Sequence, residues 1–140
     1  MKSKTLITVR YGETDMMGIL HHSVYALYYE QARFDFIKYF NLSYKQMEKY
    51  GLMMPLISLE CKYKKSLTFA DEIIVETSVE ELRFAKIKFK YNIYNSENEL
   101  VNSGSTEHAF VDSTTFKPLN LKKMFPDIYM YFKNSIEISD

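Results

Sequence analysis

Residues 24–40, VYALYYEQARFDFIKYF, decide the fold that we expect for this chain. At about 100° per residue, the aromatic and small side chains of this stretch share one broad face of a helix. They are Tyr25, Tyr28, Tyr29, Ala32, Phe36, Tyr39 and Phe40, and Glu30, Gln31, Asp35 and Lys38 gather opposite them. A face so wide and so aromatic predicts a helix embedded in a concave surface, with Ser23 as its N-cap.

The rest of the chain is predicted to be mostly β-strand. Residues 57–64, ISLECKYK, and 86–95, KIKFKYNIYN, alternate apolar with polar or charged side chains, which is typical of a strand with one wet face. Further strands are predicted at residues 5–10, 73–82 and 100–112. A short helix is predicted within 41–51, capped by Ser43 and ended by Gly51, and a short helical turn within 119–132. Short connections favour antiparallel neighbours.

These patterns predict one α+β domain spanning residues 1–140. In it, a curled antiparallel sheet of about five strands wraps around one long central helix. With 46% hydrophobic residues, the chain is expected to bury a real core rather than to be disordered.

Composition argues against several classes of protein. The 18 basic and 18 acidic residues give no net charge, so binding to nucleic-acid phosphates is not expected. The single cysteine, Cys61, cannot form an internal disulfide, which favours a cytoplasmic location. The first residues lack the apolar core of a signal peptide, and no apolar run approaches the length of a membrane span.

Familiar catalytic motifs are missing from the sequence. It holds no nucleophile elbow, no phosphate-binding loop and no dinucleotide-binding glycine motif. Cys61 falls on the apolar side of an alternating strand, which indicates a structural thiol rather than a nucleophile. Adjacent histidines such as His21 and His22 point in different directions, and zinc requires three or four ligands. We therefore expect neither a metal site nor a cofactor.

Asp15 has two interpretations. In a glycine-containing loop, an aspartate usually closes an Asx-turn. Asp15 also precedes the start of the predicted helix by a few residues, and a helix start offers free backbone N–H groups and a partial positive charge. There the N–H groups could hold a developing oxyanion while the carboxylate acts as base or nucleophile on the same carbon. The residues alone leave both interpretations open.

The stretch from Arg10 to Arg33 carries the pattern R-Y-x-x-T-D-x-x-G-x-x-H-H-x-x-Y-x-x-x-x-E-x-A-R. This pattern resembles the 4-hydroxybenzoyl-CoA thioesterase family, nearest its YbgC-like branch. The resemblance implies the hot-dog fold and hydrolysis of an acyl-CoA thioester. It implies that Asp15 is the catalytic carboxylate and that the His22 amide at the first position of the central helix polarises the thioester carbonyl. In the YbgC-like branch, the resemblance implies that Tyr11 and His22 also assist. Direct attack through an anhydride and activation of a water molecule both remain open.

The substrate-binding residues expected on the same grounds are Tyr25, Arg83 and Phe84. Tyr25 lies on the helix face that serves as both core and acyl pocket in hot-dog proteins. Arg83 matches one position of a basic cluster that contacts the nucleotide in the aromatic-CoA branch. Phe84 and Ala85 follow it here, so one charge of that cluster remains, and this argues against a tight nucleotide site and against an aromatic acyl group. The lysines of the strands are expected to form solvated faces, with binding of CoA phosphates as the alternative.

Other functions remain as alternatives. The substrate could be an acyl-carrier protein, or the domain could bind acyl-CoA or a partner without chemistry. A hydratase would have to rely on Glu107 and His108 of a late strand. Because a single curled sheet leaves edges unpaired and hot-dog proteins pair edge to edge, a homodimer or homotetramer is expected.

Overall fold

The computed structural model describes residues 1–137, so the last three residues of the predicted domain lie outside it. Its elements, in chain order, are β1 (Ser3–Thr8), the 3-10 helix η1 (Tyr11–Glu13), α1 (Val24–Lys38), α2 (Tyr44–Tyr50), β2 (Leu52–Met53), β3 (Leu56–Tyr63), β4 (Glu72–Leu82), β5 (Lys86–Tyr94), β6 (Leu100–Ala109), β7 (Val111–Asp112), α3 (Leu121–Met124) and α4 (Pro126–Glu137). Each of the five predicted strands is present, with its ends shifted by a few residues.

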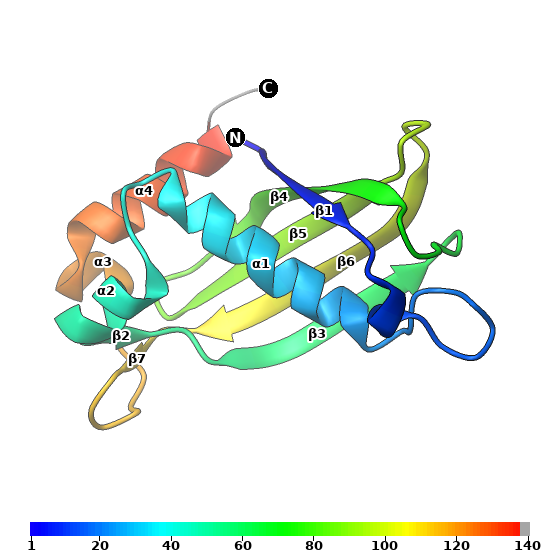
Figure 1. Cartoon of the computed structure of the whole chain (residues 1–140). Helices are drawn as coiled ribbons and strands as arrows, with labels where there is room; N and C mark the ends of the chain where they lie inside the picture. The colour runs from blue at the N-terminus through cyan, green and yellow to red at the C-terminus, as the bar shows by residue number, and fades with distance from the viewer. Residues whose placement is uncertain (138–140) are drawn as a thin grey trace.

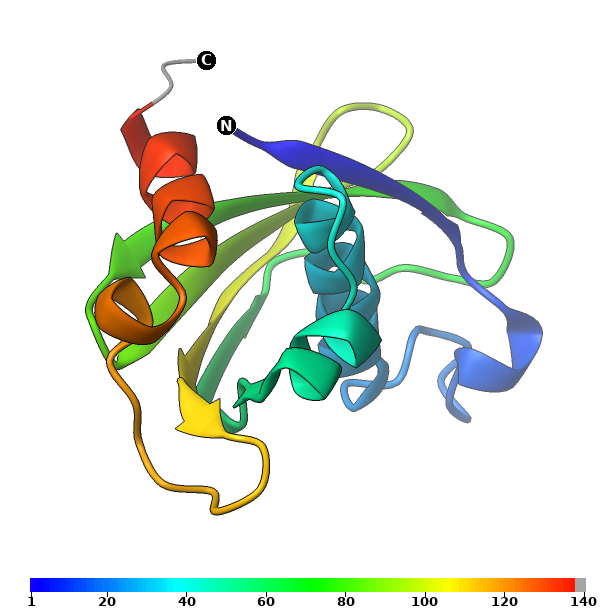
Figure 2. The ribbon, with the colours of Figure 1, turned by 90° about the vertical axis from the view of Figure 1, so that its left-hand side faces the viewer.

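The five long strands form one antiparallel sheet in the order β1-β4-β5-β6-β3. Figure 1 shows α1 crossing one face of this sheet, and Figure 2 shows the sheet bending over the helix. β2 and β7 pair with each other in a separate two-stranded sheet. The predicted α+β architecture is confirmed, with a sheet that curls but does not close.

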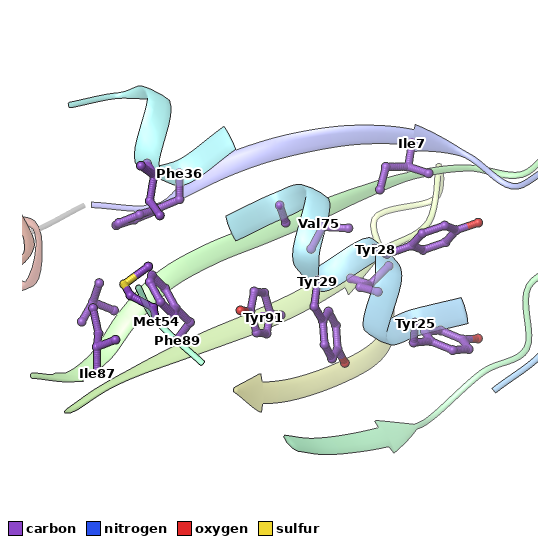
Figure 3. Close-up of a cluster of buried hydrophobic side chains, with 14 of the residues drawn as sticks. Ile7, Tyr25, Tyr28, Tyr29, Phe36, Met54, Val75, Ile87, Phe89 and Tyr91 are labelled. Atoms are coloured by element: carbon purple, nitrogen blue, oxygen red, sulfur yellow. The ribbon is translucent and has the colours of Figure 1, made fainter. Parts of the chain in front are cut away.

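The core lies between α1 and the sheet, where aromatic side chains of both meet (Figure 3). The apolar residues of β5 are fully buried, as their alternation predicts: Ile87, Phe89, Tyr91 and Ile93. Tyr29 of α1 stacks on Tyr91 with ring centroids 4.3 Å apart. Gly104 of β6 lies directly under Tyr29, and a Cβ atom there would lie 2.3 Å from the Tyr29 hydroxyl oxygen. The glycine therefore sets how closely the helix approaches the sheet.

The buried face of α1 matches the prediction except at its end. Tyr25, Tyr28, Tyr29, Ala32 and Phe36 are all buried. Tyr39 is 63% exposed, contrary to the prediction, because the helix ends at Lys38 and the chain then turns through Asn41, whose φ is +58°.

The predicted caps differ in outcome. Ser43 caps α2 as predicted, because its hydroxyl accepts from the Gln46 amide (3.1 Å), and Gly51 ends α2 with a left-handed φ of +107°. Ser23 occupies the predicted N-cap position of α1, but its side chain makes no capping hydrogen bond, contrary to the prediction. Its backbone is already helical, and its hydroxyl hydrogen-bonds Nδ1 of His21 (2.8 Å) instead of a helix amide.

Strand β3 was predicted to bury the side chains of one face and to expose those of the other, and the structure differs. Every residue of β3 is exposed except Cys61, which is half-buried. The reason is that β3 is the edge strand of the sheet, paired on one side with β6 and uncovered on the other. In a single chain, its alternating apolar side chains therefore stay accessible.

A buried arginine was not predicted. Arg33 of α1 is only 8% exposed, and its guanidinium donates to the hydroxyls of Tyr44 (3.1 Å) and Tyr91 (3.2 Å). Within residues 1–137 no carboxylate pairs with it. Tyr91 continues the network to Thr106, which also bonds His108 of β6 (2.9 Å). The core thus holds a cation that neutral hydroxyl groups solvate.

The C-terminal stretch forms more helix than the predicted short turn. α3 and α4 lie against one end of the sheet, where Phe132 contacts the rings of Phe89 and Phe110. In the described chain, no helix has both the length and the apolar character needed to cross a membrane.

Candidate active site

The segment between β1 and α1 forms a closed loop that carries Asp15 (Figure 1). A single β-bridge joins Thr14 to Leu20, and the Asp15 amide donates to the Ile19 carbonyl (2.9 Å). Gly18 turns the loop with a φ of +79°, a conformation that glycine adopts without strain, and its amide donates back to the Asp15 carbonyl (2.9 Å). The backbone of Asp15 is therefore held on both sides.

The Asp15 side chain closes an Asx-turn, and its geometry is also compatible with a catalytic role. Its Oδ1 accepts from the Met17 amide (2.8 Å), which is an Asx-turn. Its Oδ2 has no hydrogen-bond partner in the part of the chain that the structure describes. One carboxylate oxygen thus fixes the orientation of the group, and the other is left to act on a ligand.

His22 lies just before α1 rather than at its first position, because the helix begins at Val24. The Val24 amide donates to the His21 carbonyl (3.0 Å), and the Ser23 amide donates to Nδ1 of His21 (3.2 Å). The His22 amide has no hydrogen-bond partner among residues 1–137. It is an unpaired donor at the end of α1 that carries the positive part of the helix dipole.

The two adjacent histidines stack, with ring centroids 4.1 Å apart and an interplanar angle of 30°. Among the described residues, no three His, Cys, Asp or Glu side chains are placed to hold a metal ion. His21 instead hydrogen-bonds the residue before α1, because its Nδ1 contacts both the hydroxyl and the backbone amide of Ser23.

A cleft of about 240 Å³ opens between the loop, the start of α1 and the end of β3. Its walls are Asp15, Met17, Ile19, Leu20, His22, Tyr25, Tyr63, Lys64, Lys65 and Ser66. Three of the six predicted site residues meet there, namely Asp15, His22 and Tyr25. The residues that carry a free carboxylate oxygen and an unpaired helix-end amide therefore line the same cleft.

Glu13 anchors the Asp15 loop to α1, a role that sequence reasoning missed. Its Oε1 accepts from the hydroxyl of Tyr28 (2.6 Å) and from the Arg10 amide (2.9 Å), and its Oε2 pairs with the Arg10 guanidinium (3.3 Å). Burial raises the pKa of Glu13, but these hydrogen bonds and the Arg10 charge together hold it below its ordinary value of 4.5. The ionised carboxylate thus ties the loop to the second turn of the helix.

Tyr63, the last residue of β3, is a second residue that the sequence did not single out. Its hydroxyl donates to the His22 carbonyl (3.2 Å), and its ring meets the Tyr25 ring edge to face, with centroids 5.1 Å apart. Burial and the nearby Cys61 raise the pKa of Tyr25 to about 12. Its alternating position predicted only an inward-facing apolar side chain, so nothing in the pattern signalled a contact with the helix entry.

The other three predicted site residues do not line this cleft. Tyr11 is 76% exposed and packs on Phe69. Arg83 and Phe84 lie between β4 and β5, at the end of the sheet far from the start of α1 (Figure 1). Arg83 pairs with Glu81 (2.7 Å) beside a shallow depression of about 300 Å³. Phe84 contacts Tyr129. In a single chain, these three residues are not assembled with Asp15.

Comparison with known proteins covers most of the chain. Residues 9–128 match the family model described as the thioesterase-like superfamily. The chain is 36% identical over 133 residues to YneP of Bacillus subtilis, named as a candidate acyl-CoA thioesterase, covering 95% of this chain and 96% of YneP. It is 25% identical over 117 residues to the acyl-CoA thioester hydrolase YbgC of Escherichia coli, covering 84% and 87% of the two chains.

A solved structure is also closely similar. A DHNA-CoA thioesterase from Staphylococcus aureus superposes with a TM-score of 0.92 at 38% sequence identity, and the match covers 97% of this chain and 91% of the other. The likeness thus extends over both the Asp15 loop and the sheet.

Proposed function

The chain belongs to the thioesterase-like superfamily, and on that basis we propose that it hydrolyses acyl-CoA thioesters in the cleft beside Asp15. It has the hot-dog fold, and its relationship to YbgC-like thioesterases, inferred from the Arg10–Arg33 pattern, is confirmed. The names of YneP and YbgC both refer to acyl-CoA thioester cleavage, which supports an acyl-CoA substrate for this chain.

One observation carries the proposed mechanism. The free Oδ2 of Asp15 and the unpaired His22 amide belong to residues that line the same cleft at the start of α1. The amide and the helix dipole would stabilise the negative charge that develops on the thioester oxygen, which is typically worth about 2.7–4 kcal/mol for one donor. The carboxylate would act on the carbonyl carbon from the cleft wall.

Two routes are compatible with this arrangement. In the first, Asp15 attacks the carbonyl carbon, the C–S bond breaks to release the CoA thiolate, and water hydrolyses the resulting anhydride. In the second, Asp15 removes a proton from a water molecule that attacks the carbon, and that proton passes to the leaving thiolate. Neither route requires a metal or a cofactor.

The test compares Asp15→Asn with Asp112→Asn in the purified protein. Asp112 is the matched control because its Oδ1 also closes a turn, accepting from the amides of Thr114 (2.8 Å) and Thr115 (2.9 Å), but it lies far from the cleft. Release of free CoA thiol is followed for acetyl-, hexanoyl-, palmitoyl- and benzoyl-CoA. We expect Asp15→Asn to lower kcat by about 10²–10⁴-fold with an unchanged circular dichroism spectrum, and Asp112→Asn to retain activity.

Unchanged turnover in Asp15→Asn would refute the role of that carboxylate. Saturable binding of thioesters without turnover by the unmodified protein would instead favour the non-catalytic module. Faster turnover of acyl groups on carrier protein than on CoA would favour the carrier-protein substrate. The assay with benzoyl-CoA distinguishes two opposed expectations for the acyl group. The S. aureus relative is a DHNA-CoA thioesterase, which favours an aromatic acyl group, whereas the isolated charge of Arg83 argues against one.

We also propose that two copies pair through β3. This edge strand exposes Leu56, Ile57, Leu59 and Tyr63, and Leu27 and Phe34 of α1 are exposed as well. Pairing of two β3 strands would continue the sheet and cover this apolar surface. Sedimentation equilibrium is expected to give a dimer or a tetramer, and Leu59→Lys to shift the protein toward the monomer. A monomer at all concentrations would contradict the pairing.

A further inference from the structure

Tyr63 joins the edge strand to the start of the central helix. Its hydroxyl donates to the His22 carbonyl oxygen at 3.2 Å, across 41 residues of sequence. Its ring also packs edge to face on Tyr25, in the first turn of α1. Because Tyr63 ends β3, this hydrogen bond is a direct side-chain link between that strand and His22, which lines the cleft.

The peptide group between His22 and Ser23 is held at both of its polar atoms. Tyr63 bonds its oxygen, and Nδ1 of His21 accepts from its N–H at 3.2 Å. The peptide unit is planar, so fixing both atoms fixes the whole unit. Only the two backbone dihedrals of His22 then separate this immobilised peptide from the unpaired His22 amide. Restraining one peptide therefore restrains the direction of the neighbouring N–H.

We propose that Tyr63 is a positioning residue of this site, whose hydroxyl holds the His22 carbonyl so that the adjacent His22 amide stays directed at the cleft. The inference rests on the proposed thioesterase function. The oxygen of the thioester gains negative charge mainly in the transition state, so a misdirected amide weakens catalysis more than substrate binding. Tyr63 itself contacts backbone rather than the reacting carbonyl.

The hydroxyl remains a donor over the working range of pH. The nearby Cys61 and burial raise the pKa of Tyr63 to about 12. The ring of Tyr63 has a separate packing role against Tyr25, so the hydroxyl must be removed without the ring. Tyr63→Phe makes that change. Tyr39→Phe is the matched control, since Tyr39 is exposed, lies beyond the other end of α1 and has no side-chain partner among the described residues.

The experiment measures kcat and KM for both variants and for the unmodified protein on the best thioester of the panel. We expect Tyr63→Phe to lower kcat about tenfold with KM changed less than twofold, which corresponds to about 1.4 kcal/mol of activation free energy. Tyr39→Phe is expected to match the unmodified protein. As a readout besides activity, the ¹H–¹⁵N resonance of the His22 amide should shift in Tyr63→Phe and not in Tyr39→Phe.

The outcomes separate this inference from the proposed function. If the unmodified protein turns over thioesters and Asp15→Asn does not, the proposed function stands. Tyr63→Phe with unchanged kcat, or with an unmoved His22 resonance, then overturns the positioning role alone. A Tyr63→Phe protein whose KM rises by as large a factor as its kcat falls would also overturn it, because it would indicate a loss of substrate binding as well as of catalysis. Absence of turnover on the whole panel by the unmodified protein overturns both.

Discussion

Replacing Gly104 with alanine tests how tightly α1 lies on the sheet. A Cβ atom at residue 104 would lie 2.3 Å from the Tyr29 hydroxyl oxygen and 2.5 Å from the Glu60 carbonyl oxygen. Both distances fall well inside the 3.0 Å below which real Cβ contacts are essentially absent. One neighbour is backbone, and the other is a fully buried ring that stacks on Tyr91. Neither can move without displacing the helix or the edge strand.

The expected cost follows from these contacts. Overpacking of a filled core costs about 1–3 kcal/mol. The shift of Tyr29 would also weaken its hydrogen bond to Asn102, and an average hydrogen bond contributes about 1 kcal/mol. We therefore expect Gly104→Ala to lower the free energy of unfolding by about 3 kcal/mol, a large part of the roughly 5–15 kcal/mol that stabilises a protein domain.

Urea unfolding monitored by circular dichroism, at one fixed protein concentration, measures this difference. The matched control is Gly12→Ala, because an added Cβ at residue 12 meets no atom within 4 Å. Gly12→Ala should change the stability by less than about 1 kcal/mol. A second variant, Gly104→Ala with Tyr29→Phe, removes the nearest clashing atom but leaves the Glu60 oxygen and the ring carbon Cε2 of residue 29, 2.7 Å away, so it should be only somewhat less destabilised than the sum of its single changes.

A loss of less than about 1 kcal/mol in Gly104→Ala would refute the reasoning, since a loss that small falls below the overpacking range. Strict additivity in the double variant would show that the clash with the Tyr29 hydroxyl does not contribute to the loss.

The remaining predictions concern the helix caps and a buried histidine. Ser43→Ala should lower the free energy of unfolding by about 1 kcal/mol, because it removes the hydroxyl that accepts from the Gln46 amide. Ser23→Ala should change it by less than about 0.5 kcal/mol, because Ser23 makes no cap bond, and equal losses in urea titrations would contradict the assignment. Burial, together with the Arg33 charge, lowers the pKa of His108 from 6.5 to about 4, so the unfolded chain binds its proton more readily. Stability should fall by up to about 3 kcal/mol as the pH drops from 6.5 to 4, and His108→Gln should flatten this part of the pH profile.

The elements that sequence reasoning predicted well are those in which local pattern and tertiary burial agree. β5 alternates strictly and lies at the centre of the sheet, so its inward residues are all buried. β3 alternates just as clearly, but its place at the edge is set by pairing with β6, which local pattern does not encode. Arg33 escaped notice for a similar reason, since its hydroxyl partners come from α2 and β5.

The candidate site was predicted in part. The spacing of the motif brought Asp15, His22 and Tyr25 to one cleft, because these residues are close in the chain and their separation is set by one loop and one helical turn. Glu13 and Tyr63 were missed because their roles depend on contacts with α1 that lie outside any sequence motif. The roles predicted for Tyr11, Arg83 and Phe84, and the cytoplasmic location, stay predictions.

Strand β3 ends in Tyr63, and no other strand within residues 1–137 pairs with its outer edge. An unpaired edge frays more readily than the middle of a sheet, and here fraying would release the residue that steadies the helix entry. A second copy bound along that edge would suppress this local opening. Dimerisation and catalytic activity would then be linked. Dilution would lower the activity before the protein unfolded, and the turnover per chain would rise with enzyme concentration.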